Sequence, residues 1–127
     1  MTNPLNIVTE IPTENEIRNA IAEFLIYHGW LVLRVNSGAA VTTEKGKRRF
    51  VQFIKWMALG QGTQTAGVSD LLCFKPGNRP LAIETKTPGN KPTEAQKSFL
   101  AAWGAHGGAW CVASSVDDVA LAIGEAQ

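Results

Sequence analysis

The sequence predicts an α/β protein with a mixed central β-sheet flanked by helices. Three observations lead to this fold class: a helical pattern over residues 13–28, short apolar runs bounded by turn residues, and a second helical pattern that begins near residue 93. Strands separated by long helical segments are typical of a mixed sheet. The predicted order of the elements is αβββαβ, with a closing helix after it.

Length and composition fit one folded domain. At 127 residues the chain is expected to form a single domain over residues 1–127, and 45% hydrophobic with 18% charged residues is typical of a folded protein. The formal net charge of +1 says nothing about nucleic acid. No stretch approaches the roughly 18 apolar residues of a membrane span, and the N-terminus lacks signal-peptide features, so we expect neither membrane insertion nor export.

The first helix is predicted from its cap and its periodicity. Thr13 is a good N-cap and Glu16 follows at the capping-box spacing. Apolar residues then recur with helical spacing, and Gly29 is a good stop signal: Ile17, Ile21, Phe24, Leu25 and Tyr27. We therefore expect a helix over residues 13–28, with His28 serving its C-terminal end, followed by a buried strand over residues 30–36 because that segment is branched and apolar.

A hairpin is expected in the segment between residues 41 and 59. It should turn near Lys45-Gly46, with residues 50–54 as its second strand. Residues 60–67 contain three glycines and are predicted to be a mobile loop. That loop lacks the Gly-Lys-Ser/Thr ending of a phosphate-binding P-loop, so glycine content alone does not indicate nucleotide binding.

The C-terminal part is predicted to be helix, strand and helix. Pro92-Thr93-Glu94 begins the second helix, and His106 is expected to serve its C-terminal end. Residues 110–113 form a short strand, and a closing helix over residues 116–123 is capped by Ser114 or Ser115. Two tryptophans of this part are expected in the core, and both cysteines of the chain are expected to pack there as small buried side chains: Trp103, Trp110, Cys73 and Cys111.

The most informative segment is a hairpin between two carboxylates. Residues 71–74 and 81–83 are apolar, and Pro76-Gly77-Asn78 between them is a turn signal. If Lys75 pairs with Arg79, Asp70 lies directly opposite Glu84, with Cβ atoms roughly 4.5–5.5 Å apart. A five-residue loop would instead make the pair diagonal, about 7–8 Å apart. Either register brings both carboxylates together, and strand alternation places Lys86 on the same face as Glu84.

Two opposed carboxylates and a nearby ammonium indicate a metal site for cutting phosphodiesters. The carboxylates repel each other unless a cation lies between them. Oxygen ligands favour Mg²⁺ or Mn²⁺ over Zn²⁺, and neither cysteine is placed to supply a thiolate pair. The alternative is a surface hairpin with ordinary solvated charges.

These residues carry a resemblance to a known family. Gly67-Val68-Ser69-Asp70, the segment Ile83-Glu84-Thr85-Lys86-Thr87-Pro88-Gly89 and the segment from Lys91 to Gln96 resemble the virus-type replication-repair nuclease domain, VRR-NUC, of the PD-(D/E)XK nuclease superfamily. The resemblance extends upstream through residues 14–17, 28–30 and 34–38. It implies a restriction-endonuclease-like core.

The resemblance implies a role for each matching residue. Asp70, Glu84 and the Thr85 carbonyl would bind Mg²⁺ or Mn²⁺, and Lys86 would orient or activate the attacking water. Glu14 matches an additional helical acid that aids a second ion, although Glu16 is an alternative for that position. The remaining matches are Gln96 as an active-site residue and Arg34, Asn36 and Ser37 as substrate or active-site support.

A basic cluster lies between the upstream match and the predicted hairpin of carboxylates. Its members are Lys45, Lys47, Arg48 and Arg49. Such a cluster can neutralise DNA phosphates, an attraction that weakens with salt. The alternative is an exposed loop kept soluble by its charge.

The function expected from these features is a Mg²⁺- or Mn²⁺-dependent DNA endonuclease. The resemblance implies branched DNA such as four-way junctions or flaps as substrate, a homodimer, and the cytoplasm of a bacterial or phage-infected cell, since stand-alone members occur in bacteriophages and bacteria and some are dimers. Two other classes stay open: a DNA-binding or partner-binding module that does not cut, and an assembly protein with exposed aromatics.

Overall fold

The computed structural model of the protein describes residues 11–35, 39–44, 47–52 and 54–124, and only the backbone of 39–44 and 47–52. Four strands form the central sheet in the order β1-β6-β7-β8. They are β1 (Leu31–Arg34), β6 (Leu71–Phe74), β7 (Leu81–Thr85) and β8 (Ala109–Ala113). The β1/β6 and β6/β7 pairs are antiparallel, whereas β7 and β8 are parallel. The mixed sheet of the predicted α/β fold is therefore confirmed.

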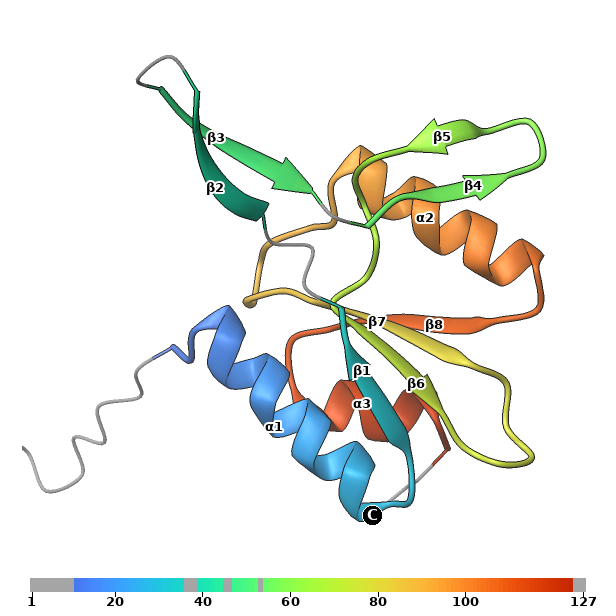
Figure 1. Ribbon diagram of the computed structural model, residues 1–127. Helices are drawn as coiled ribbons and strands as arrows, with labels where there is room; N and C mark the ends of the chain where they lie inside the picture. Colours follow the sequence, from blue (N-terminus) through green and yellow to red (C-terminus); the bar gives the residue numbers. More distant parts are fainter. Residues whose placement is uncertain (1–10, 36–38, 45–46, 53, 125–127) are drawn as a thin grey trace, which may run out of the picture.

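Helices cover the two faces of this sheet (Figure 1). The first face packs against α1 (Glu14–Tyr27) and α3 (Val116–Ala122), with Leu81 and Ile83 of β7 in that core. The other face packs against α2 (Glu94–Ala105), with Ala82 of β7 in a second core. Because successive side chains of a strand point to opposite faces, β7 is buried along all five residues and is the central strand of the fold.

The predicted helix boundaries are confirmed by their caps. Capping boxes begin both α1, with Thr13 and Glu16, and α2, with Thr93 and Gln96. Ser115 is the N-cap of α3. At the other ends, Nδ1 of His28 donates to the Phe24 carbonyl at 2.8 Å, and Nδ1 of His106 donates to the Ala102 carbonyl at 2.7 Å. Both histidines thus serve helix ends, as expected.

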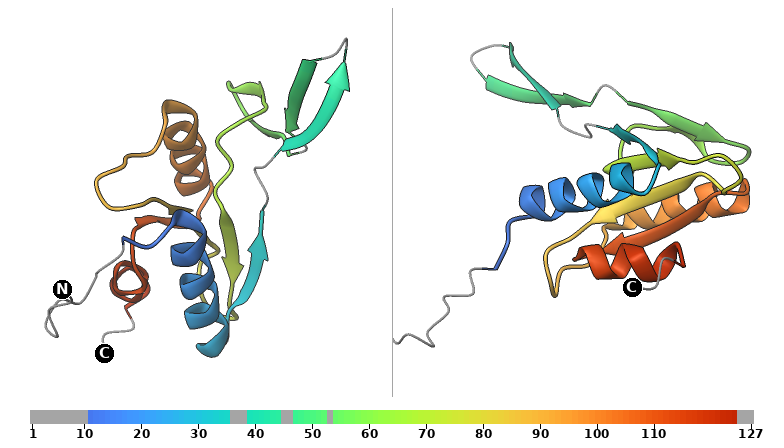
Figure 2. Two further views of the ribbon diagram at one scale, coloured as in Figure 1. Left: turned by 90° about the vertical axis from the view of Figure 1, so that its left-hand side faces the viewer. Right: turned by 90° about the horizontal axis from the view of Figure 1, so that it is seen from below.

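Two hairpins occupy the segment between β1 and β6. The first joins β2 (Ala39–Glu44) to β3 (Lys47–Gln52) with Glu44 opposite Lys47, and it projects away from the sheet (Figure 1; Figure 2). Its second strand begins earlier than the predicted residue 50, and the predicted turn at Lys45-Gly46 lies outside the described residues. The second joins β4 (Trp56–Ala58) to β5 (Gly62–Gln64). Its Trp56 ring packs edge-on against the ring of Phe99 on α2, with 5.5 Å between the ring centroids.

Three predictions from local pattern were wrong. The segment after Trp30 is an edge strand, and Leu31 is 62% exposed because it lies on the face of β1 that neither core covers, whereas Val32 on the other face packs against the core of α1 and α3. Residues 62–64 are a strand rather than loop, because Gly60 at φ +83° closes a turn with β4. Trp110 is 48% exposed because β8 is the other edge strand, whereas Trp103 is half-buried and donates to the Ala109 carbonyl at 2.8 Å.

Cysteine burial agrees with the expectation. Cys73 is fully buried and Cys111 packs against the same core. Burial raises the pKa of Cys73 to about 12 and that of Cys111 to about 11, so both remain neutral thiols. Among the described residues, no helix has the length and apolar character needed to cross a membrane.

Candidate active site

Asp70 and Glu84 lie side by side at one end of the central strands. The register of β6 and β7 pairs Leu71 with Ile83, Leu72 with Ala82 and Cys73 with Leu81. Continuing it by one residue places Asp70 directly opposite Glu84, which is the first of the two predicted registers. The side chains are almost inaccessible, since Asp70 is 7% exposed and Glu84 1%. Two carboxylates are therefore buried together.

Each carboxylate has one oxygen bound by a neutral donor. The backbone N–H of Thr85 donates to Oδ2 of Asp70 at 2.8 Å, and Nε2 of Gln96 donates to Oε1 of Glu84 at 2.9 Å. Oε2 of Glu84 is buried and has no hydrogen-bond partner in the part of the chain that the structure describes. The two side chains are thus fixed in orientation, while one oxygen of Glu84 stays without a hydrogen-bond partner among the described residues.

The electrostatics of this pair favour a bound cation. The pKa of Glu84 is raised to about 8, first by burial and then by the neighbouring charge of Asp70, while Lys86 acts in the opposite direction. Burying an unpaired carboxylate is costly, and a divalent cation removes both the repulsion and the unsatisfied acceptor. The donor set fits such an ion.

The number of acidic side chains at the site agrees with the usual coordination of Mg²⁺ in proteins. No group of three or more His, Cys, Asp or Glu side chains in the described part of the chain is arranged to hold an ion. Mg²⁺ is commonly bound through one or two carboxylates, with water and substrate phosphate completing its shell. Two acidic side chains with all-oxygen chemistry therefore fit Mg²⁺ or Mn²⁺ better than a fully protein-enclosed zinc site.

Gln96 links helix α2 to the carboxylates. Its backbone and side chain complete the capping box with Thr93, and its side-chain NH₂ also donates to Glu84. The start of α2 is brought here by Gly67, whose φ is +95° and where a Cβ would lie 2.2 Å from the carbonyl oxygen of Ala95. Only glycine allows this approach. The position of Gln96 thus depends on a close contact between two backbones.

The two candidate helical acids have different surroundings. Oε1 of Glu16 accepts from the Thr13 backbone N–H at 3.0 Å, and that contact lowers its pKa. Oε1 of Glu14 lies 3.3 Å from Nη2 of Arg18, and the charge of Glu14 is one of those that raise the pKa of Glu84. Arg18 therefore lies between Glu14 and Asp70, whereas Glu16 serves the helix cap.

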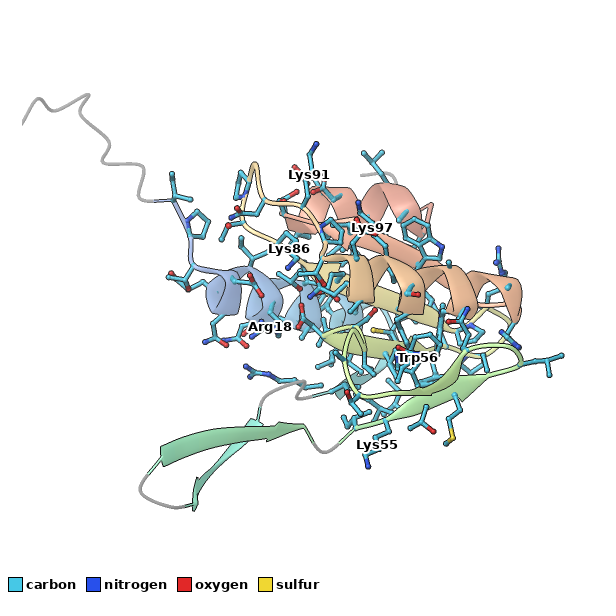
Figure 3. All side chains as sticks on the ribbon, turned by 90° about the horizontal axis from the view of Figure 1, so that it is seen from above. Arg18, Lys55, Trp56, Lys86, Lys91 and Lys97 are labelled. Atoms are coloured by element: carbon cyan, nitrogen blue, oxygen red, sulfur yellow. The ribbon has the colours of Figure 1, made fainter. Side chains whose placement is uncertain are left out.

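Lys86 follows the last residue of β7. Its backbone N–H donates to the Ala113 carbonyl at 2.9 Å, which continues the parallel pairing with β8. The side chain is half-buried, and its charge lowers the pKa of Glu84. Figure 3 shows Lys86 and Arg18 at the end of the sheet that lies between α1 and α2. An ammonium is thus available beside the acidic pair.

The predicted DNA-contacting residues are only partly described. Arg34 is exposed at the end of β1, and its Nη2 donates to Oδ1 of Asn15 on α1 at 2.7 Å. Asn36, Ser37 and Lys45 lie outside the described residues. The backbones of Lys47, Arg48 and Arg49 belong to β3 in the projecting hairpin, and their side chains are not described. The placement of β3 leaves these three residues apart from the carboxylate pair (Figure 1).

Sequence reasoning did not single out Arg18 and Asn15. Arg18 lies near both Glu14 and Asp70, and Asn15 accepts hydrogen bonds from Arg18 and Arg34. The four-residue spacing from Glu14 to Arg18 was a visible signal for an ion pair on one helix face. The contact with Asp70 had no such signal, because it joins α1 to the start of β6.

Comparison with known protein families gives one match. The model of the VRR-NUC domain matches residues 12–117, which include every described element up to the first turn of α3. Comparison with curated proteins and with solved structures finds no match.

Proposed function

This chain belongs to the VRR-NUC family, whose members are nucleases that act on DNA, and from that premise we propose that it is a metal-dependent DNA endonuclease. Asp70 and Glu84 are the proposed ligands of Mg²⁺ or Mn²⁺, with the Thr85 carbonyl as a backbone ligand and Glu14 aiding a second ion. The reaction is the hydrolysis of a phosphodiester bond.

One observation carries this proposal: two buried, opposed carboxylates each have one oxygen fixed by an uncharged donor. The fixed oxygens set the orientation of the side chains, and Oε2 of Glu84 remains without a partner among the described residues. Ligands that are oriented by further hydrogen bonds bind a metal with a smaller loss of conformational freedom.

Each residue of the site has its own proposed role in hydrolysis of the phosphodiester. Asp70 and Glu84 would hold a divalent cation, which would supply charge stabilisation at the phosphate oxygens and a lower pKa for a bound water. Lys86 places a positive charge beside the same phosphate and orients the attacking water. Gln96 keeps Glu84 in its binding orientation. These contributions act together, so removing any one of the charged groups should have a large effect on the rate.

The proposed substrate is branched DNA, and the proposed active form is a homodimer. Two symmetric cuts in a four-way junction need two active sites, which a two-fold dimer supplies. The basic residues of β3, together with Arg34, are proposed to contact the phosphates beside the cleaved bond. These contacts would hold the DNA without taking part in bond cleavage.

The test is a cleavage panel with variants of the acidic pair. Purified protein is incubated with labelled four-way junctions, flaps, duplexes and single strands, with Mg²⁺, Mn²⁺ or EDTA, and its solution mass is measured. Asp70→Asn, Glu84→Gln and Lys86→Met should each lower cleavage by about a thousandfold or more while keeping the fold. Lys97→Gln is the matched control, since Lys97 pairs with Glu94 on the outer side of α2.

The outcomes separate the candidate classes. Metal-dependent products that the three variants lose support the endonuclease, and junction-specific products from a dimer support the branched substrate. DNA binding without products under every metal condition would instead identify a non-cleaving binding module. Wild-type cleavage by all three variants would reject the assignment of the site.

A further inference from the structure

The guanidinium of Arg18 lies between two acidic side chains at the proposed metal site. Its Nη2 is 3.3 Å from Oε1 of Glu14 and 3.7 Å from Oδ1 of Asp70. The side chain is only 15% exposed, and Figure 3 shows it on the same end of the molecule as Lys86. A positive charge of the chain itself therefore lies beside a carboxylate that is proposed to bind a cation.

We propose that Arg18 is the built-in counter-ion of the acidic site: it neutralises Asp70 and Glu14 while the site lacks a metal, and it weakens the binding of the divalent cation by remaining beside it. This makes Arg18 a positioning residue that sets the metal affinity. The inference rests on the proposed function, since it requires the cation to bind at Asp70 and Glu84.

The contact with Asp70 has the length of a charge contact rather than of a hydrogen bond. At 3.7 Å, Nη2 is too far from Oδ1 to donate a hydrogen bond to it, whereas Oδ2 is bound by Thr85 at 2.8 Å. Arg18 thus supplies charge to the oxygen of Asp70 that Thr85 leaves open. A cation can displace such a contact without breaking a hydrogen bond.

The other contacts of Arg18 hold it on its own helix. Nη1 donates to Oδ1 of Asn15 at 3.2 Å, and Nη2 donates to Glu14 one turn earlier. These bonds do not involve the sheet, so Arg18 can keep them when Asp70 binds a cation. Because the guanidinium is always charged, it remains beside the ion and repels it. Its removal should therefore strengthen cation binding rather than weaken it.

The experiment measures cation binding directly. Mn²⁺ is titrated by calorimetry into the wild type and into Arg18→Gln, Arg18→Met, Arg18→Lys and Lys97→Gln, in the absence of DNA. Removing one positive charge near a divalent ion should tighten Mn²⁺ binding by about tenfold. Arg18→Lys keeps the charge and should stay within about twofold of the wild type, as should Lys97→Gln.

A second measurement separates charge balance from a structural role. Thermal unfolding is followed in EDTA and in saturating Mn²⁺. The neutral Arg18 variants should have a lower melting temperature than the wild type in EDTA, because Asp70 and Glu14 have then lost the guanidinium beside them, and saturating Mn²⁺ should remove most of the difference. Folding of these variants only with Mn²⁺ present would give the same support.

The failures are distinguishable. A wild type that binds no Mn²⁺ would overturn the proposed function. A wild type that binds Mn²⁺ while Arg18→Gln and Arg18→Met bind it equally or more weakly would overturn only the counter-ion role. The same conclusion follows if neither neutral variant folds even with saturating Mn²⁺, since Arg18 would then be required by the fold itself.

Discussion

The two charged regions of this molecule are built in opposite ways. The carboxylates at the end of β6 and β7 are buried. Their surroundings are the backbone N–H of Thr85, the amide of Gln96 on α2 and the guanidinium of Arg18 on α1. The basic strand β3 pairs with β2 in a hairpin that projects from the sheet (Figure 2). Precise geometry is needed where bonds are broken, whereas DNA phosphates can be attracted by charge on a simple arm.

This difference predicts different responses to mutation. Changes at the buried carboxylates or at the residues that orient them should alter cleavage through geometry, and their effect should depend on the shape of the new side chain. Changes in the projecting hairpin should alter DNA affinity in proportion to the charge removed. The expectations below test this contrast from the largest effect to the smallest.

The largest effect is expected at Gly67. In Gly67→Ala the new Cβ would lie 2.2 Å from the Ala95 carbonyl oxygen at a positive φ, so the start of α2 must move and carry Gln96 away from Glu84. We expect a loss of about 2–4 kcal/mol in the free energy of unfolding, and a further loss of cleavage in the folded fraction. Urea unfolding and cleavage assays measure the two effects.

Gly77→Ala is the matched control for that substitution. Gly77 also has a positive φ, +78°, but a Cβ there has no described atom within 4 Å. Gly77→Ala should lose about 1 kcal/mol in the free energy of unfolding, because alanine disfavours a positive φ, and it should cleave normally once folded. Equal losses at both glycines would contradict the view that the contact with Ala95 positions Gln96.

The next effect separates the two roles of Gln96. Gln96→Leu removes its hydrogen bond to Glu84 together with its part of the capping box, and should lower cleavage about ten- to a hundredfold. Thr93→Ala removes the hydroxyl of the same capping box, at a cost of about 1 kcal/mol, and leaves the bond to Glu84 intact. Steady-state kinetics with thermal unfolding should show similar stability but unequal activity; equal activity would argue against an orienting role.

The projecting hairpin should respond through affinity alone. Replacing Lys47, Arg48 and Arg49 by Gln should weaken DNA binding about tenfold at moderate salt and reduce the slope of log affinity against log salt by about 3. Fluorescence anisotropy over a salt series measures this slope. The rate at saturating DNA should stay unchanged, and a fall in that rate would place the hairpin residues nearer to the chemistry than proposed here.

The last prediction is a pH-dependent stability difference. Because the folded-state pKa of Glu84, about 8, lies above its ordinary value of 4.5, the folded protein binds more protons and loses stability as pH rises between these values. Glu84→Gln lacks this loss. Its melting temperature in EDTA should therefore exceed that of the wild type by a margin that grows from pH 5 to pH 8.

Saturating Mn²⁺ gives the control for this prediction. The cation binds the ionised wild-type site and stabilises it by mass action, whereas Glu84→Gln should gain much less. A melting-temperature difference that stays constant across this pH range would show that Glu84 ionisation does not limit the stability of the metal-free protein.

Much of the local structure could be predicted from the sequence. The caps at Thr13 and Thr93 follow from side chains three residues apart, and the turn signal at Pro76-Gly77-Asn78 predicts a hairpin that brings Asp70 close to Glu84 in either of its two possible registers. These features depend on contacts between residues close in the chain, so local patterns specify them.

Two of the errors share one cause. Leu31 and Trp110 were expected inside because their segments are apolar, yet both lie on edge strands. An apolar run indicates a strand but does not reveal whether that strand lies at the centre or at the edge of the sheet. The contact of Arg18 with Asp70 was missed for a related reason, since it depends on how α1 packs against the sheet.

The sequence by itself determined the helices with their caps and the meeting of the two carboxylates at one end of a hairpin, because short-range hydrogen bonds and strand alternation fix them. Only the structure decided which of the two registers the hairpin adopts, which strand is central, how deeply Glu84 is buried and that Arg18 lies beside Asp70. Those properties depend on the packing of surfaces far apart in the chain, where the total burial of apolar area rather than any local pattern selects the arrangement.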